Sequence, residues 1–365
     1  SWSGQANISL DGATIKGKDI KLSASSTYDD SVLTALLPIT VSVVGTGVDV
    51  KSSTLSASGD LSLEAISLTK ASTSGVLPLG STVAVSTAAV DVSGASVLSA
   101  GGDLKLNASS TVESKVVPGL PDLKKLPGDA GAALNVIVST ASAHAGDSTT
   151  LTANSGAAEV KATNKVTATT KADSSAEGVV AVGGTVALSE VTTVTQAYID
   201  GTATTNAASL SVAAESQNTV TTSAKAAAKG ANKQTEAEKA ASPSLTEKIL
   251  AKFKNQAKTT EGSIEVAAAV AIANVNSVTQ AYVASTGMQT TTGATAVSSK
   301  AVTSSSVTAD GSSTNSEVGI GAAVGVNVGV LVNQASIADN SNLDSNGLTV
   351  SATMPTDTAK STFAT

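Results

Sequence analysis

His144 is the only histidine in the 365-residue chain, so it is the first residue to consider for acid–base or metal chemistry. One histidine excludes a multi-histidine metal site and any catalytic arrangement that needs a second histidine. Serine and threonine are so abundant that a serine near His144 gives no indication of a nucleophile. The surrounding segment, residues 143–146, is Ala-His-Ala-Gly and is typical of an exposed or turn position. We therefore predict no catalytic residue and no metal ligand here.

The 29 acidic residues are scattered and do not form the glycine- and aspartate-rich arrays that bind calcium. Asp60 and Asp103 follow glycines at predicted corners, where we expect their carboxylates to bond local backbone amides rather than a metal. There is no cysteine, which excludes disulfides and thiolate chemistry. We expect no cofactor, no metal and no enzymatic activity. A polysaccharide-processing enzyme is a weaker alternative, since its site would need clustered Asp, Lys or Arg and the chain has no arginine.

All 22 basic residues are lysine, the net charge is −7 and the pI is about 4.8. The guanidinium fork that reads phosphates and guanine edges is therefore missing, and we expect no nucleic-acid partner. No run of about 18 apolar residues occurs, so we expect no transmembrane segment.

Residues 224–261 contain eight lysines and are rich in Ala, Glu and Gln, which favour helix. Pro243 interrupts the stretch, a capping box follows at 244–247, and apolar residues then recur at helical spacing. This pattern predicts a helical hairpin inserted into the fold. The hairpin either contacts an acidic partner or anionic membrane, or packs its apolar side on the body of the protein with its lysines in water. The candidate partner-contact residues are Lys225, Lys229, Lys233, Lys248, Lys252 and Phe253.

The elements around these residues repeat one pattern, which is clearest at residues 90–108. Apolar residues alternate with small or polar ones, a Gly-Gly-Asp corner follows, and the alternation resumes. This pattern predicts a parallel β-solenoid filled by Val, Ala, Leu and Ile, with Ser and Thr exposed. We predict a single repetitive domain over residues 1–365, and the lack of a signal peptide suggests a fragment of a longer protein. Seven copies align on a residue of the short strand after each corner: Leu22, Leu63, Leu106, Val160, Val212, Val297 and Val350.

A second set of related segments supports this register. Val-Thr-Gln-Ala-Tyr occurs at 194–198 and again at 278–282, and Val-Asn-Gln-Ala-Ser occurs at 332–336. We predict that Gln196, Gln280 and Gln334 occupy equivalent positions. Their side-chain amides either bond one another in a ladder or stay exposed without mutual bonds.

In residues 318–333 one parity is mostly β-branched and the other is mostly glycine, alanine or asparagine. An extended run of this length spans roughly 50 Å, which is more than one side of a narrow coil. Either the run bends at its glycines, or each repeat is a single wide turn. The extra residues of the repeats fall after the short strand, at 28–38, 117–129 and 224–261. We therefore expect a loop insertion at 117–129 and all insertions on one face.

The segment 90–108 resembles the shaft repeats of filamentous-haemagglutinin-type secreted adhesins. The segments 177–201 and 265–286, with their Val-Thr-Gln-Ala-Tyr blocks, resemble the repeats of leukotoxin-type filamentous adhesins. The resemblance implies a right-handed parallel β-helix that forms part of a stalk on a bacterial surface, acting in attachment or biofilm scaffolding.

The expected function is accordingly a structural stalk or adhesin segment, extracellular or on the bacterial cell surface, that displays distal binding regions. Its partners would be the neighbouring repeats of the same polypeptide and a host or matrix glycan or protein, and the segment itself would be monomeric. The alternative is a glycan- or protein-binding module acting through the inserted loops.

Overall fold

The computed structural model describes residues 1–30, 39–75, 78–118, 128–178, 180–230, 264–314, 318–354 and 362–364. These residues form strands joined by short turns, and none of them is helical. A helix able to cross a membrane is therefore not found within these ranges.

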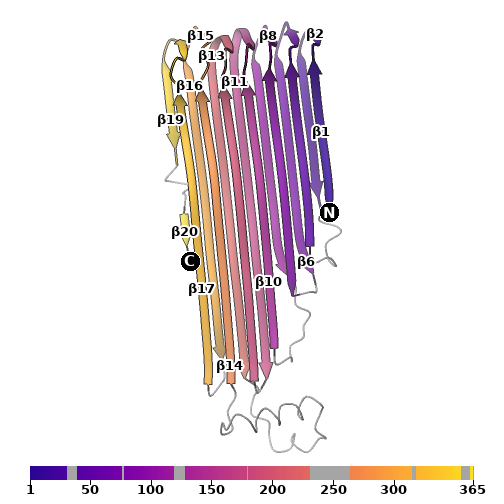
Figure 1. Ribbon diagram of the computed structural model, residues 1–365, viewed down its shortest axis with the longest axis vertical. Helices are drawn as coiled ribbons and strands as arrows, with labels where there is room; N and C mark the ends of the chain where they lie inside the picture. The colour runs from indigo at the N-terminus through magenta and orange to yellow at the C-terminus, as the bar shows by residue number, and fades with distance from the viewer. Residues whose placement is uncertain are drawn as a thin grey trace, which may run out of the picture.

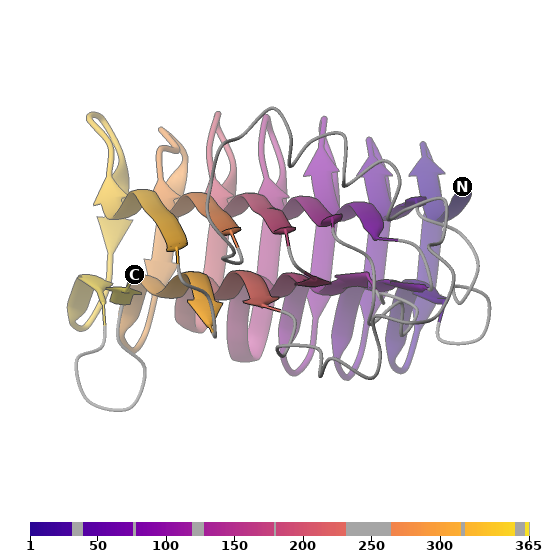
Figure 2. The same ribbon diagram turned by 90° about the horizontal axis from the view of Figure 1, so that it is seen from below.

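The chain builds seven layers across two facing sheets (Figures 1 and 2). The first six layers have one long strand in each sheet, and the returning part of the seventh is divided into two short strands. In every layer the chain runs along sheet A, turns at a corner and returns along sheet B. All strand pairs within each sheet are parallel. Sheet A consists of β1 (Trp2–Asp11), β4 (Ile39–Lys51), β7 (Leu79–Ser93), β10 (Gly128–Ala145), β12 (Val180–Ile199), β14 (Ile264–Val283) and β17 (Val318–Ile337).

Sheet B contains the returning strands and the short strands that follow the corners. The returning strands are β3 (Ile20–Asp29), β6 (Leu61–Gly75), β9 (Leu104–Pro118), β11 (Thr150–Gly178), β13 (Thr204–Gly230), β16 (Thr295–Thr314), β19 (Leu348–Thr353) and β20 (Thr362–Ala364). The short strands are β2 (Thr14–Gly17), β5 (Thr54–Ala57), β8 (Val97–Ala100), β15 (Met288–Thr291) and β18 (Asn342–Asp344).

The register predicted from the corners is confirmed. The seven aligned residues, from Leu22 to Val350, are paired strand by strand in one continuous row of sheet B. Each layer is also a single wide turn, since β17 crosses the whole sheet as one strand of 20 residues. At the usual spacings this makes a body about 65 Å across and about 30 Å along the stacking direction.

The layers widen along the chain (Figure 1). The strands of sheet A contain 10 residues in β1, 13 in β4, 15 in β7, 18 in β10, and 20 in β12, β14 and β17. The corners remain level, so the added length lies at the opposite edge, which we call the wide edge. The predicted insertion at 117–129 begins and ends at this edge: its first two residues belong to β9, its last two to β10, and 119–127 fall outside the described ranges.

The predicted fold class, a right-handed parallel β-solenoid with a helical hairpin insertion, was wrong. The fold is all-β with parallel sheets, but the long strands form two broad sheets that face each other around a nearly closed interior. Residues 224–230 continue β13 instead of starting a helix. Ala226 and Ala228 are buried there while Lys225 and Lys229 are exposed, so an alternation of period two overrides the helical preference of these residues. Residues 231–261 lie outside the described part of the chain.

The interior has two hydrophobic clusters with a polar band between them. The cluster nearer the corners includes Leu63, Leu106 and Ile199, and the cluster nearer the wide edge is mostly alanine and valine. Hydroxyl and amide side chains cross from sheet to sheet in the band. The bonds run from Ser67 to Ser86 (2.7 Å), Ser86 to Ser110 (2.8 Å), Ser110 to Ser139 (2.9 Å) and Ser139 to Asn164 (2.8 Å). The expectation that serine and threonine would be confined to the surface was therefore wrong.

The two sheets come very close together toward the wide edge. A Cβ on Gly183 of β12 would lie 2.9 Å from the carbonyl oxygen of Ala227 in β13, and one on Gly131 of β10 would lie 3.0 Å from that of Asp173 in β11. Only small side chains fit between backbones at this distance. The valines of β17 point outward together with Ala322, and its glycines and Ala323 point inward.

The outward branched aliphatic side chains of sheet A form a continuous surface, which we call the valine face. Its members are Ile39, Val41, Val43, Leu79, Val83, Val85, Leu134, Val136, Val138, Val182, Val186, Leu188, Val194, Val266, Val270, Ile272, Val278, Val318, Ile320, Val324, Val326, Val328, Val330 and Val332.

Candidate functional site

His144 lies near the corners on the outer side of sheet A, in a row of paired positions. Successive strands place Asp91, His144, Tyr198 and Tyr282 side by side, since each is the direct partner of the next in the parallel ladder. We call these four residues the His144 row. The strands set this spacing, because parallel pairing aligns equivalent positions of adjacent layers.

Both ring nitrogens of His144 are bonded to carboxylates. Nδ1 lies 2.5 Å from Oδ1 of Asp91, and Nε2 lies 2.9 Å from Oδ1 of Asp200, which follows β12 at the next corner. The imidazole stacks on Tyr198 with ring centroids 4.3 Å apart, and Tyr198 stacks on Tyr282 at 4.8 Å. The His144 side chain is only 17% exposed. The prediction of an exposed or turn histidine was thus wrong: His144 is on strand β10 and partly buried.

The electrostatics favour a protonated imidazole. Burial lowers the pKa of His144, but the hydrogen bonds and charges of Asp91 and Asp200 outweigh it, so the net pKa is raised. In return, the hydrogen bond from His144 lowers the pKa of Asp91. Burial and the neighbouring charge of Asp200 raise the pKa of Tyr198, and burial together with Tyr198 raises that of Tyr282 to about 12.

This arrangement binds adjacent layers together and is poorly suited to catalysis. A cationic imidazole with both nitrogens bonded to carboxylates has no lone pair to accept a proton or coordinate a metal. Tyr198 is stacked between His144 and Tyr282, so both faces of its ring are covered. In the described part of the chain no three His, Asp or Glu side chains gather in a metal-binding group.

The corners contain a second ladder, formed by aspartates. The backbone amide of Asp60 donates to Oδ1 of Asp19 (3.1 Å), that of Asp103 to Asp60 (2.9 Å), and that of Ala157 to Asp103 (3.0 Å). The amide of Ala157 also lowers the pKa of Asp103. Asp60 and Asp103 do bond backbone amides, but the prediction of local amides was wrong, because these amides belong to the next layer.

The predicted glutamine positions are also confirmed. Gln196, Gln280 and Gln334 are direct partners in sheet A. The Nε2 group of Gln196 donates to Oε1 of Gln280 (2.9 Å), and Gln280 donates in the same way to Gln334 (3.2 Å). Of the two alternatives left open by the sequence, the structure has the bonded ladder.

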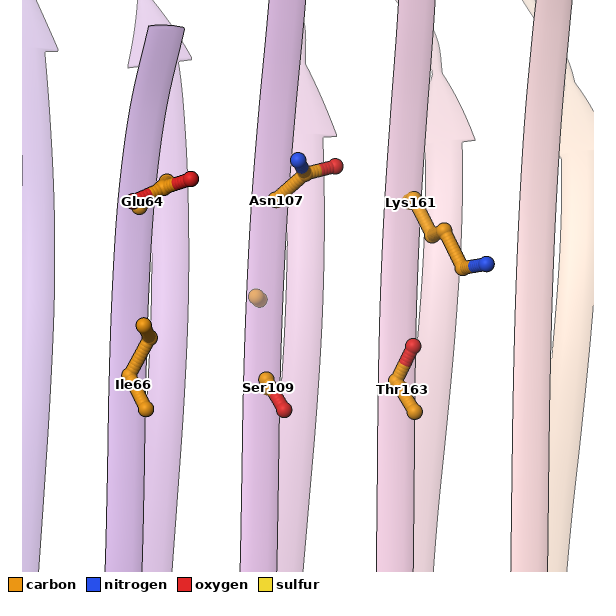
Figure 3. A pocket seen from close by; sticks show the side chains of 7 residues that line it. Glu64, Ile66, Asn107, Ser109, Lys161 and Thr163 are labelled. Atoms are coloured by element: carbon orange, nitrogen blue, oxygen red, sulfur yellow. The ribbon is translucent and has the colours of Figure 1, made fainter. Parts of the chain in front are cut away.

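A shallow hollow of about 240 Å³ lies on the outer side of sheet B (Figure 3). It forms where the short side chains Asn107 and Ser109 of β9 stand between the longer ones of β6 and β11. Its charged lining groups already have partners: Glu64 pairs with Lys21 (2.7 Å), and Lys161 pairs with Glu215 (3.1 Å). Pockets for organic ligands are usually larger, about 300–1,000 Å³, and more enclosed. The hollow is therefore a weak candidate for a ligand site.

Two of the six predicted contact residues can be placed. Lys225 and Lys229 are exposed on the outer side of sheet B near the wide edge. Lys225 is paired in register with Asp173 on one side and Asp310 on the other, so acidic neighbours surround it. Lys233, Lys248, Lys252 and Phe253 lie outside the described residues.

The His144 row was missed from the sequence, although a signal for it exists. Asp91 precedes His144 by 53 residues. Tyr198 follows His144 by 54 residues and precedes Tyr282 by 84, whereas the steps from Leu106 to Val160, Val212 and Val297 are 54, 52 and 85. The repeat register therefore brings these residues within two positions of one row, and only the strand pairing aligns them fully.

Comparisons with protein-family models, with curated proteins and with solved structures find no match for this chain.

Proposed function

We propose that this chain is a non-enzymatic structural segment of a filamentous adhesin, secreted or displayed on a bacterial surface, that holds distal binding regions away from the cell. One observation supports this most strongly. The layers repeat in register, and the bonds that join them, in the aspartate and glutamine ladders, run along the stacking direction. Such a body lengthens simply by adding layers.

Support also comes from the two ends of sheet A. Strand β1 pairs only with β4, and β17 pairs only with β14, so each has one backbone edge without a partner strand in the described part of the chain. Open edges of parallel sheets accept further strands. Neighbouring repeats of the same polypeptide are the partners that this arrangement suits best.

A tandem fusion of two copies of the chain, imaged by electron microscopy, tests the structural role. If the chain is a stalk segment, the fusion forms one continuous body about 30 Å longer than the single copy. Two separate particles joined by a flexible link would contradict the proposal.

The alternative is a glycan- or protein-binding module, and one observation favours it. The strand ends that flank the long inserted stretches all lie at the wide edge, opposite the corners (Figure 1). Replacing residues 231–261 with a short Gly-Ser linker preserves every described strand and distinguishes the two roles. If the chain is a structural segment, this variant retains its β-sheet circular dichroism, and cells that display it adhere as before. A binding module retains the fold and loses adhesion.

A further inference from the structure

The valine face is the largest feature of the structure that the proposed function does not use. Parallel sheets normally have both faces covered, and here the outer face of sheet A is open. Leu79 is 58% exposed, Val186 is 48% exposed and Val324 is 51% exposed. Apolar surface of this extent on a protein usually marks an interaction site.

Neighbouring layers cannot cover this face. A layer added beyond β1 or β17 would bond to the backbone edge of sheet A and continue the sheet in its own plane. The outward side chains would remain exposed, and the apolar surface would become larger. Whatever covers the valine face must therefore approach perpendicular to the sheet.

The charge distribution indicates the chemistry of the partner. Lys51, at a corner, is the only lysine on the described strands of sheet A, whereas sheet B has lysines across its outer side. A surface without cations does not favour anionic lipid headgroups. Glu190 is the one carboxylate among the aliphatic side chains, and the Asn274 amide donates to both of its oxygens (2.9 and 3.0 Å). The face is thus suited to another flat, apolar, uncharged surface.

The face also has the area and the border of a protein interface. Its strands and aliphatic rows cover about 1,000 Å² at standard sheet spacings. A stable interface of standard size buries about 800 Å² per partner. The His144 row and the glutamine ladder border the apolar area on its corner side, as polar residues border the core of an interface.

We propose that the valine face is the interface of a symmetric dimer, in which two copies of this chain pack sheet A against sheet A. Two sheets whose outer side chains interdigitate lie about 10 Å apart with their strands roughly aligned. A face that pairs with itself gives a closed dimer and no larger species. This inference does not depend on the adhesin proposal and replaces the sequence-based expectation of a monomer.

Sedimentation velocity of the whole chain over a range of concentrations tests the dimer. The unmodified chain is expected to form dimers and to stop there. Val186→Glu introduces a charge into the face and should raise the dimer dissociation constant at least about 10-fold. Glu190→Gln removes a charge from the face, and this variant should dimerise at least as tightly as the unmodified chain. Thr219→Glu, an exposed position on the opposite side in β13, is the matched control and should leave the constant unchanged.

Cysteine chemistry gives an independent readout, because the chain has no cysteine of its own. A short bis-maleimide should cross-link Val136→Cys into dimers and leave Thr219→Cys monomeric. Circular dichroism of each variant shows whether it folds.

Three results would overturn the proposal. A monomer at all concentrations would mean that no second copy covers the face. Growth beyond the dimer, or equal weakening by Thr219→Glu, would assign association to the sheet edges or to sheet B. Binding of the unmodified chain to phosphatidylcholine vesicles that is lost in Val186→Glu would assign the face to lipid.

Discussion

The carboxylate of Asp60 accepts a hydrogen bond of 2.9 Å from the backbone amide of Asp103, one layer further along the stack. The equivalent bond from Asp60 to Asp19 joins the preceding pair of layers. An aspartate at the corner therefore stabilises a turn other than its own. The adjacent glycine is needed because a Cβ on Gly102 would collide with the Asp60 carboxylate.

Asp60→Ala removes this acceptor and should destabilise the protein by about 1 kcal/mol. Asp60→Asn, which retains a carbonyl acceptor, should lose less stability than Asp60→Ala. Urea unfolding measures both, with Ser62→Ala on the same segment as the control. Equal stability of Asp60→Ala and Ser62→Ala would show that the corner bond contributes nothing.

Gly101→Ala should destabilise the protein by about 1–3 kcal/mol, because the new methyl group would overlap the Ser58 carbonyl of the preceding corner. Gly184→Ala is the matched control, since a Cβ there meets no atom within 4 Å. This second change should be neutral or slightly stabilising, because alanine restricts the unfolded chain. Thermal unfolding of the two variants compares them directly, and similar melting temperatures would contradict the close packing of the corners.

Asn218→Ala should cost about 2–3 kcal/mol. The fully buried amide donates to hydroxyls of Thr193 (3.2 Å), Ser277 (3.0 Å) and Thr303 (3.3 Å), so the change removes several bonds of the polar band together. Asn206→Ala, exposed on the same strand, should change stability by less than about 0.5 kcal/mol. Chemical denaturation of the pair decides whether the band stabilises the fold.

The bond between His144 and Asp91 should make stability depend on pH. The pKa of His144 is raised on folding, so its contribution is complete below about pH 6.5 and is lost as the pH rises through the folded value. The pKa of Asp91 is lowered, so its contribution is present above about pH 3.9 and is lost as the pH falls through its folded value. We expect the pH-dependent contribution to the free energy of unfolding to be on the order of 1 kcal/mol, since Asp91 and Asp200 are both more than a third exposed.

Proton NMR measures the pKa of His144 directly, because His144 gives the only imidazole signal. Its titration midpoint should lie above 6.5 and should move back toward 6.5 in Asp91→Asn. His144→Gln should abolish the loss of stability between neutral and alkaline pH. A midpoint at or below 6.5 in the unmodified chain would mean that burial outweighs the two carboxylates.

The parts of the fold that depend on spacing along the chain could be predicted from the sequence. The corner row from Leu22 to Val350 and the partners Gln196, Gln280 and Gln334 follow from repeat offsets, which parallel pairing converts directly into neighbours. The all-β class follows from the period-two alternation. Each of these signals is local or strictly repeated.

The direction of the side chains in 318–333 could not be predicted in the same way. One parity is mostly valine and the other is mostly glycine, alanine and asparagine, so the alternation does not say which side faces the partner sheet. The choice depends on the separation of the two sheets, which is so small near Gly183 and Ala227 that only small residues fit inside. Residues 224–230 raised a related difficulty. Alanine and lysine favour a helix in isolation, whereas their alternation favours the extended strand that forms the end of β13.

Because the layers widen gradually along the chain, they should unfold in a fixed order under mechanical load. Ten residues of β1 pair with β4, whereas all twenty residues of β17 pair with β14. The force needed to detach a layer depends on how many bonds must break at once. A chain pulled from its ends should therefore unravel from the narrow N-terminal layers first, and each wider layer should resist a larger force than the one before it.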